Sequence, residues 1–193
     1  MLRPYTLTGI STEEVLDLLN RRRSWVQAVC ITGGEPTLAP VLEEFVRRLK
    51  GCGFKVKLDT NGTRPEIIAR LLAGGLLDYV AMDVKGPPAK YDLLTGTSGA
   101  DLEAVKESIT LLKSSRVACE FRTTAVPGLL GEEDLLTTGR LLAGAWRYVL
   151  QQFRPGNTLL DAGFRELRPY PGSTLRSLAQ KLRPYIDEVE VRE

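Results

Sequence analysis

Three short polar runs mark this sequence, because each ends a strand-like apolar stretch with residue types that bind charged ligands. They are Ile31–Thr37 (ITGGEPT), Leu58–Gly62 (LDTNG) and Met82–Lys85 (MDVK). Each run leads toward a helical pattern, so we expect the three polar groups at the carboxyl ends of parallel strands. That end of the sheet is where α/β folds bind ligands.

The first run carries two adjacent glycines, Gly33 and Gly34, where its strand stops. Glycine allows backbone conformations and a close ligand approach that a Cβ atom would block. On its own, the pair is more typical of a tight strand-to-helix turn in which Pro36 starts the helix. Combined with Glu35 and the other two runs, it favours a ligand-binding turn.

The second and third runs place Asp59, Asp83 and Lys85 at successive strand ends. Alone, the segment from Asp59 to Gly62 is typical of a strand that closes with an Asn-Gly turn. Together, two carboxylates and an ammonium group over one mouth of the sheet suit a zwitterionic amino acid ligand.

Strand and helix patterns alternate along the chain and predict a parallel sheet with right-handed crossovers. A capped helix is expected from Ser11 to about Ser24, and a long irregular stretch from Pro155 to Gly172. The expected strands are Val26–Thr32, Phe54–Thr60, Tyr79–Val84, Val117–Thr124, Arg147–Phe153 and Ile186–Val191. The other main helices are Val41–Lys50, Pro65–Ala73, Leu102–Lys113, Glu132–Ala143 and Thr174–Leu182.

Polar residues alternate with apolar ones in several strands, which favours a barrel over an open sheet. Lys55, Lys57 and Asp59 share one face of their strand, whereas a strand buried on both faces would be almost wholly apolar. Glu120, Arg122 and Thr124 repeat the pattern in a later strand. Strands that each turn polar residues inward describe a concave pocket. We therefore predict a partial (β/α)6 TIM-like barrel, with residues 1–193 as a single domain.

Composition excludes several classes of protein. The chain has 26 Lys and Arg against 24 Asp and Glu, a net charge of +2 that argues against nucleic-acid binding. It contains no histidine, which excludes Ser-His-Asp hydrolysis and imidazole-ligated metal sites. No apolar run approaches the roughly 18 residues of a membrane span, and no signal peptide is evident, so we expect a cytoplasmic protein.

The three cysteines, Cys30, Cys52 and Cys119, have neither metal-site nor redox spacing. Cys30 and Cys119 fall within apolar strand patterns, and Cys52 follows a helix. We interpret all three as structural free thiols.

The polar runs resemble those of the radical S-adenosylmethionine (SAM) superfamily, and the resemblance extends from about Ser11 to Glu193. Within it, the chain is similar to the activating enzymes of anaerobic ribonucleoside-triphosphate reductases. The resemblance implies that SAM is bound by Thr32, Gly33, Gly34, Glu35, Pro36, Asp59, Asn61, Asp83, Lys85, Arg122 and Gln152.

Roles within that set also follow from the resemblance. The Gly-Gly-Glu turn, Asp59 and Asp83 belong to the amino end of SAM, with a monovalent cation near the two aspartates, and Lys85 belongs to the carboxylate. Arg122 is assigned to a carboxylate or ribose oxygen, although a structural salt bridge to Glu120 or Asp83 is an alternative. Gln152 stands as a substitute for a histidine that some relatives carry after this strand.

The family chemistry uses a [4Fe-4S] cluster, fed by a donor such as flavodoxin or ferredoxin, to cleave SAM and form a glycyl radical on the anaerobic ribonucleotide reductase. The cluster is held by a Cys-x3-Cys-x2-Cys loop, which is absent between Met1 and Gly33. We therefore expect an N-terminally truncated form that lacks the first strand and the cluster loop. This form should hold no cluster, contribute no catalytic residue of its own and be inactive as given.

Two other functions are open at this point. The chain is alternatively a degenerate, non-catalytic protein that binds SAM or a partner. It is alternatively a radical SAM enzyme that acts on a small molecule, such as a deazaguanine-forming or peptide-modifying relative.

Overall fold

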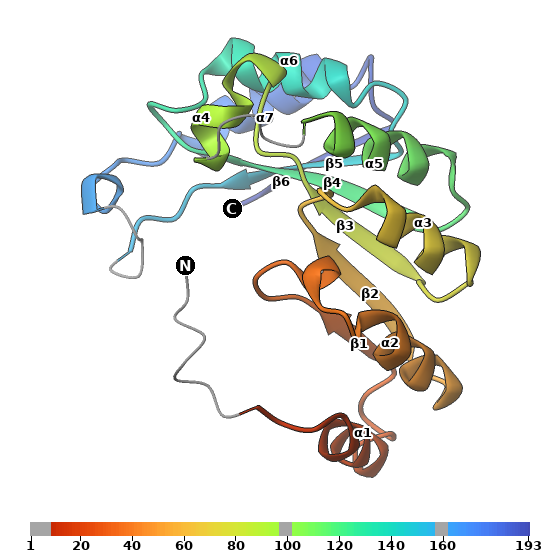
Figure 1. Cartoon of the computed structure of the whole chain (residues 1–193). Coiled ribbons are helices and arrows are strands. Elements are labelled where there is room, and N and C mark those ends of the chain that lie inside the picture. Colours follow the sequence, from red (N-terminus) through yellow and green to blue (C-terminus); the bar gives the residue numbers. More distant parts are fainter. Residues whose placement is uncertain (1–8, 97–101, 157–161) are drawn as a thin grey trace.

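One parallel sheet organises residues 9–96, 102–156 and 162–193, which are the residues that this computed structural model describes. Within them, six strands follow one another across the sheet in chain order, all parallel (Figure 1). The strands are β1 (Ala28–Ile31), β2 (Lys55–Thr60), β3 (Tyr79–Asp83), β4 (Ala118–Ala125), β5 (Arg147–Gln152) and β6 (Glu188–Arg192).

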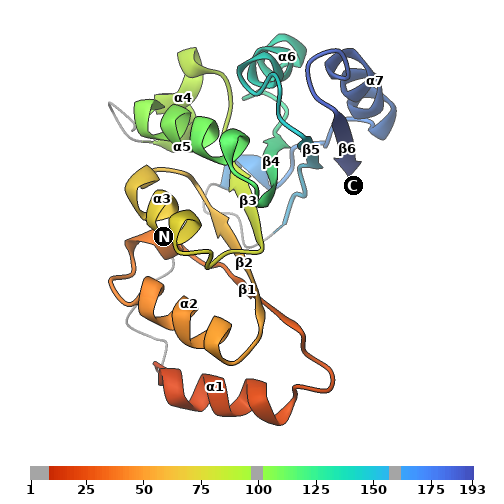
Figure 2. The same ribbon diagram turned by 90° about the vertical axis from the view of Figure 1, so that its right-hand side faces the viewer.

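Helices connect the strands and cover one face of the sheet (Figures 1 and 2). The α-helices are α1 (Thr12–Arg21), α2 (Leu42–Gly51), α3 (Pro65–Ala73), α4 (Tyr91–Thr95), α5 (Leu102–Ser114), α6 (Glu132–Leu141) and α7 (Gly172–Leu182). Short 3-10 turns occur at Pro36–Leu38, Pro88–Lys90 and Ala162–Phe164. Sequential parallel strands with helices on the outer face confirm the predicted partial (β/α)6 barrel.

The ends of several elements differ from the sequence prediction. Ser11 caps α1 as expected, and its side chain forms a capping box with Glu14. The helix nevertheless ends at Arg21, because the next residues form a turn in which the Trp25 amide donates to the Arg22 carbonyl. The last strand begins at Glu188, two residues later than predicted, and Ile186 is buried in the core just before it.

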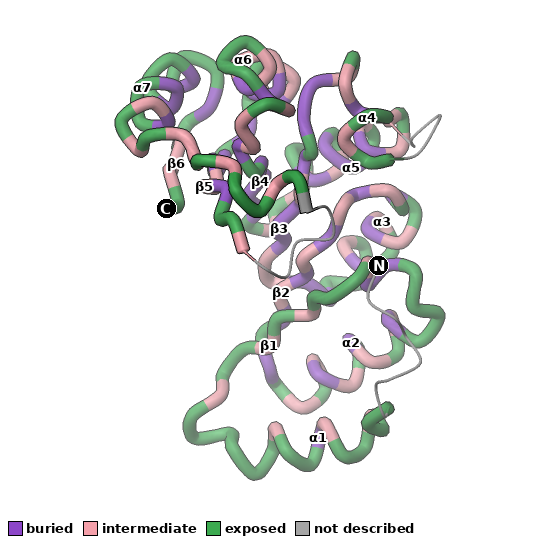
Figure 3. Tube along the Cα trace, turned by 90° about the vertical axis from the view of Figure 1, so that its left-hand side faces the viewer, coloured by how far each residue is buried: buried purple, intermediate pink, exposed green. Residues whose placement is uncertain are grey.

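The hydrophobic core lies between the sheet and its helices (Figure 3). Alternation along β2 sends Val56 and Leu58 into this core, where both are fully buried. The intervening residues Lys57 and Asp59 face the other, concave side of the sheet. Among the described residues, no helix has both the length and the apolar character needed to cross a membrane.

Candidate functional site

Five charged side chains form a continuous group on the concave face, which we call the ion-pair cluster: Lys57, Asp59, Asp83, Lys85 and Arg122. Arg122 is its centre, because Nη1 lies 3.1 Å from Asp59 Oδ2 and Nη2 lies 2.9 Å from Asp83 Oδ1. Lys57 Nζ lies 3.0 Å from Asp59 Oδ1, and Lys85 Nζ lies 3.1 Å from Asp83 Oδ2. Residues from three neighbouring strands are thus linked at one end of the sheet.

Strand register explains how these side chains meet. Asp83 and Arg122 are paired residues on β3 and β4, so their side chains leave the same face side by side. Asp59 lies one strand further away, and its partner on β3 is Ala81. The short side chain of Ala81 leaves room for Arg122 to reach across β3 to Asp59.

The cluster has an excess of positive charge. It contains three cationic side chains and two carboxylates, a difference of one positive charge. Burial opposes the ionised form of Asp59, but hydrogen bonds and charge from Lys57 and Arg122 outweigh it and hold the Asp59 pKa below its usual value. Burial likewise opposes the charge on Arg122, and Asp83 and Asp59 overcome it, so the Arg122 pKa is raised. These shifts favour the charged forms of Asp59 and Arg122, and the surplus cationic side chain of the cluster favours an anionic group.

A small hollow adjoins the cluster, with a volume of about 130 Å³. Asp83, Lys85, Arg122 and Thr124 form its polar end. Its other walls are apolar and come from Val84, Leu94, Val126, Leu129 and Leu130. A ligand with a charged head and an apolar stem would match this lining.

Glu35 holds two loops together. Its Oε1 accepts hydrogen bonds from the Thr37 amide (3.1 Å), the Thr37 hydroxyl (2.6 Å) and the Thr60 hydroxyl (2.7 Å). Its Oε2 accepts from the Asn61 amide at 2.7 Å. The carboxylate, predicted to bind the cofactor, is thus occupied by protein donors that shape the loops after β1 and β2. The Asn61 side chain is also local, since Oδ1 accepts from the amide and hydroxyl of Thr63.

The Gly33–Gly34 backbone is open to a ligand. Both residues have positive φ angles, +97° and +57°, and a Cβ atom at either position would meet nothing within 4 Å. Left-handed backbone of this kind favours glycine. Thr32, Gly33 and Pro36 line a second hollow of about 320 Å³, which also includes Ile10 and Phe45. The glycine turn thus borders a hollow different from the one beside the ion-pair cluster.

Gln152 lies away from the cluster. Its Nε2 donates to the Tyr170 carbonyl at 2.8 Å, and strand alternation places it on the helix side with Leu150. The neighbouring Gln151 pairs with Thr124 of β4 and with Arg192 of β6, so it shares the concave face with Arg122. The sequence assignment missed both Gln151 and Lys57. The alternation of side chains along β2 and β5 places both residues on the concave face, and this alternation is the signal that could have identified them.

A second charged network lies on the concave face around the buried Glu120, which precedes Arg122 by two residues on β4. Tyr79 donates its phenolic hydrogen to Glu120 Oε2 at 3.0 Å, and Arg147 Nε and Arg192 Nη2 lie 3.7 and 3.4 Å from the same oxygen. Burial and the Glu120 charge raise the pKa of Tyr79 to about 12. This network ties β3 to β6 beneath the site.

The cysteines do not fit an iron-sulfur cluster. Cys30 is exposed on the concave face, with Sγ 3.6 Å from Asp59 Oδ1, while Cys52 caps α2. Cys119 faces the helices and contacts the Leu112 carbonyl. Burial raises the pKa of the Cys119 thiol, and burial and Asp59 raise that of Cys30, which disfavours the thiolates that such a cluster requires. Across the described ranges, no group of three or more His, Cys, Asp or Glu residues is arranged to hold a metal ion.

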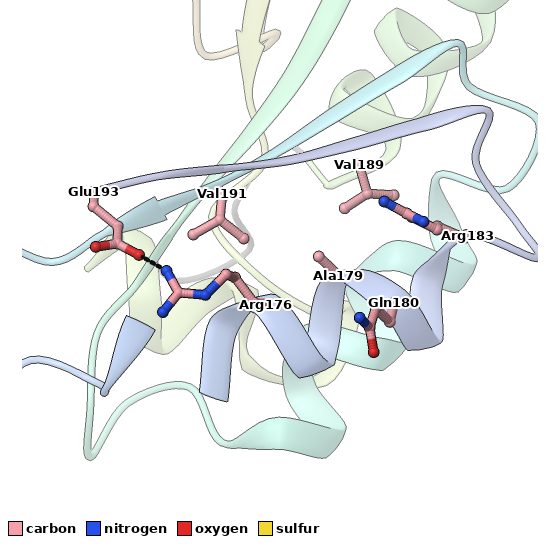
Figure 4. A pocket seen from close by; sticks show the side chains of 7 residues that line it. All are labelled: Arg176, Ala179, Gln180, Arg183, Val189, Val191 and Glu193. Atoms are coloured by element: carbon pink, nitrogen blue, oxygen red, sulfur yellow. Dashed lines mark hydrogen bonds and ion pairs between the residues drawn. The ribbon is translucent and has the colours of Figure 1, made fainter. Parts of the chain in front are cut away.

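A further hollow, of about 460 Å³, lies between α7 and β6 (Figure 4). Val189 and Val191 form part of its wall, and Arg176 forms an ion pair with Glu193 at one end. Val189 and Val191 alternate with Glu188, Glu190 and Arg192, which face the concave side. This hollow is therefore on the outer side of the sheet and separate from the ion-pair cluster.

Comparisons with known proteins agree with the resemblance in the sequence. The profile of the Radical SAM superfamily matches residues 3–140. A protein of Methanocaldococcus jannaschii, provisionally named a glycyl-radical enzyme activating enzyme, is 36% identical over 189 residues, which are 95% of this chain and 77% of that protein. The 7-carboxy-7-deazaguanine synthase of Methanopyrus kandleri is 40% identical over 76 residues, or 38% of this chain and 29% of that enzyme.

Solved structures show the same fold. A domain of pyruvate-formate lyase-activating enzyme from Bacteroides vulgatus superposes with a TM-score of 0.64 and 16% sequence identity. The match covers 86% of this chain and 99% of that domain. At this level of identity, the likeness concerns the arrangement of strands and helices.

Proposed function

This chain belongs to the radical SAM superfamily, and on that premise we propose that it binds SAM beside the ion-pair cluster as part of a glycyl-radical activating enzyme. Enzymes of this superfamily use SAM and a [4Fe-4S] cluster. The partner that we propose is an anaerobic ribonucleotide reductase, with a flavodoxin or ferredoxin as electron donor. The observation that carries the proposal is Arg122, which joins two aspartates next to an amphipathic hollow and an exposed lysine.

The residues present fit the methionine part of SAM. Its carboxylate would pair with Lys85 and Arg122, because the cluster has surplus positive charge at the mouth of the hollow. Its ammonium group needs acceptors, which backbone carbonyls of the exposed residues Thr32, Gly33 and Gly34 would supply. The aspartates would then act mainly by holding Arg122 and Lys85 in place, a more indirect role than direct contact with the amino group.

The chemistry itself comes from the bound cofactor. Bound together with a [4Fe-4S] cluster, SAM would supply the radical chemistry that removes a hydrogen atom from a glycine of the partner. The described cysteines of this chain do not fit the cluster, so no step is assigned to them. The contribution of this chain is to bind and orient SAM.

Two experiments test the proposal. First, calorimetry on this 193-residue chain should detect SAM binding, and Lys85→Met should weaken it roughly 10-fold, the effect of one lost charged hydrogen bond. Arg70→Met is the matched control, because Arg70 forms an exposed ion pair with Glu43 on the outer helices. Equal SAM affinity in Lys85→Met and the wild type would contradict the assigned site.

Second, the chain should be compared with a version in which a segment bearing Cys-x3-Cys-x2-Cys is joined before Met1. After anaerobic reconstitution, the extended version should cleave SAM and produce a glycyl radical, detected by electron paramagnetic resonance, on an anaerobic ribonucleotide reductase. The chain without this segment should produce neither. Cleavage of SAM without a radical on any glycyl-radical enzyme would favour an enzyme that acts on a small molecule.

A specific observation favours one alternative, a non-catalytic protein that binds SAM or a partner. The three cysteines lie on β1, at the end of α2 and on the outer face of β4, and none is placed to share a cluster. SAM binding by the native protein, isolated anaerobically without iron or sulfide, would support this second function.

A further inference from the structure

The two aspartates of the ion-pair cluster have no carboxylate oxygen free of a cationic partner. The two oxygens of Asp59 form ion pairs with Lys57 Nζ at 3.0 Å and with Arg122 Nη1 at 3.1 Å. Arg122 and Lys85 take those of Asp83, at 2.9 and 3.1 Å. The residues present therefore do not fit the monovalent cation that the family resemblance places near these aspartates.

Charge leads to the same conclusion. Sodium and potassium ions bind to oxygen atoms in sites where negative charge is in excess. Here three cationic side chains already exceed the two carboxylates, so an added cation would have to displace a lysine or the guanidinium. Arg122 is hard to displace, because only 12% of its side chain is exposed and it bonds to both aspartates.

Lys57 is held beside Asp59, one of the two aspartates near which the resemblance places such an ion. It precedes Asp59 by two residues on β2, so both side chains leave the same face. Its ammonium group lies 5.7 Å from the centre of the Tyr79 ring, a cation–π distance, and the Tyr79 hydroxyl is fixed by its hydrogen bond to Glu120. Lys57 is thus held between an aromatic face and the Asp59 carboxylate.

We propose that the Lys57 ammonium group replaces a bound monovalent cation in this protein and acts as a positioning residue for Asp59 and Arg122. This inference rests on the proposed SAM site, and it adds that the site needs no dissolved sodium or potassium. Asp59 would keep its orientation in any salt, because its counterion is part of the chain.

The first test uses the wild-type protein. Its SAM affinity should be measured by calorimetry in potassium, sodium and tetramethylammonium chloride at equal ionic strength, since tetramethylammonium is too large to enter a small oxygen-lined site. We expect the three affinities to agree within ~2-fold. A loss of ~10-fold or more in tetramethylammonium would overturn the proposal.

The second test substitutes Lys57. Lys57→Met keeps the aliphatic stem but frees Asp59 Oδ1, so SAM affinity in tetramethylammonium should fall ~10-fold and recover in part when sodium is added. Lys57→Arg should retain affinity and salt independence. Lys55→Met is the matched control, because Lys55 lies two residues earlier on the same face of β2. Unchanged affinity of Lys57→Met in tetramethylammonium would also overturn the proposal.

A readout that does not require SAM separates this inference from the proposed function. Sodium-23 relaxation should show no bound ion in the wild type and should show one in Lys57→Met. If the wild type fails to bind SAM, the proposed function fails, and sodium relaxation still decides the role of Lys57. Sodium bound by the wild type at Asp59 would refute that role, whatever the SAM result.

Discussion

Replacing Arg122 by methionine should expose how much the ion-pair cluster stabilises this fold. Methionine preserves most of the side-chain volume and removes the guanidinium that bridges Asp59 and Asp83. The change therefore tests charge and hydrogen bonding, with little effect on packing.

The expected loss follows from the contacts. A hydrogen bond between charged groups contributes roughly 1.5–3 kcal/mol when it is shielded from water. Arg122 makes such contacts with both aspartates, but Lys57 and Lys85 remain as partners, and a third of the Asp83 side chain is exposed. We therefore expect the free energy of unfolding to fall by about 3 kcal/mol, a decrease in Tm of about 6–12 °C for a chain of this size.

The pH dependence gives the reasoning a second check. Because the folded-state pKa of Asp59 is lowered, its contribution is present above the unfolded pKa and is lost as pH falls through the folded pKa. The difference in the free energy of unfolding between wild type and Arg122→Met should therefore be largest near neutral pH and should shrink below about pH 4.

Urea unfolding followed by circular dichroism at several pH values measures both quantities. The control is Arg70→Met, which removes an exposed ion pair with Glu43 and should change stability by less than about 0.5 kcal/mol. If Arg122→Met behaves like the control at neutral pH, or if its deficit persists unchanged in acid, the view of Arg122 as the centre of a stabilising cluster is wrong.

Three further changes test other parts of the structure. Ala81→Leu should fill the space through which Arg122 reaches Asp59 and lower stability by about 1–3 kcal/mol in urea unfolding, whereas Ala81→Ser should have a smaller effect. Glu35→Gln should lower the free energy of unfolding by about 1–3 kcal/mol, because the amide NH2 group of the glutamine would face protein donors. It should also speed hydrogen exchange of the loop amides after β2, and unchanged exchange would contradict the role of Glu35 in holding the two loops together. Since burial and Glu120 raise the Tyr79 pKa to about 12, folding stability should fall as pH rises from about 10 toward 12, and Tyr79→Phe should reduce that fall, as measured by alkaline unfolding.

Much of the fold could be predicted from the sequence, because local patterns and overall topology agree. The apolar alternation predicted a strand over Phe54–Thr60, one residue longer than the observed β2, together with its polar face. The glycine-flanked α3 matches its predicted range of Pro65–Ala73. The polar faces of β2 and β4 correctly indicated a concave, charged surface. Strand order needed no long-range information, since each described strand pairs with its neighbours in the chain.

The details of the site depended on information that the sequence does not display. Glu35 is an acidic residue in a glycine turn, and only the three-dimensional structure shows that four donors from two loops surround it. The sequence indicates only that Lys57 lies on a polar face of its strand, because an ammonium group shared between a carboxylate and an aromatic ring requires β2 and β3 in register. Gln152 lies on the helix side of β5 whereas the adjacent Gln151 lies on the concave face, because a shift of one position along a strand reverses the face.

The order of the strands also affects how the chain can assemble during synthesis. Because each described strand is a neighbour of the next one in the chain, the sheet can grow one βα unit at a time from the N-terminal side, with few contacts between distant segments. β1, β2 and β3 would assemble before β4 and would leave Asp59 and Asp83 on one surface without their shared arginine. The arrival of β4 then brings Arg122 to both carboxylates. Electrostatic attraction would thus help to select the register in which β4 joins β3. The charged residues proposed to hold SAM would then also guide the docking of β4.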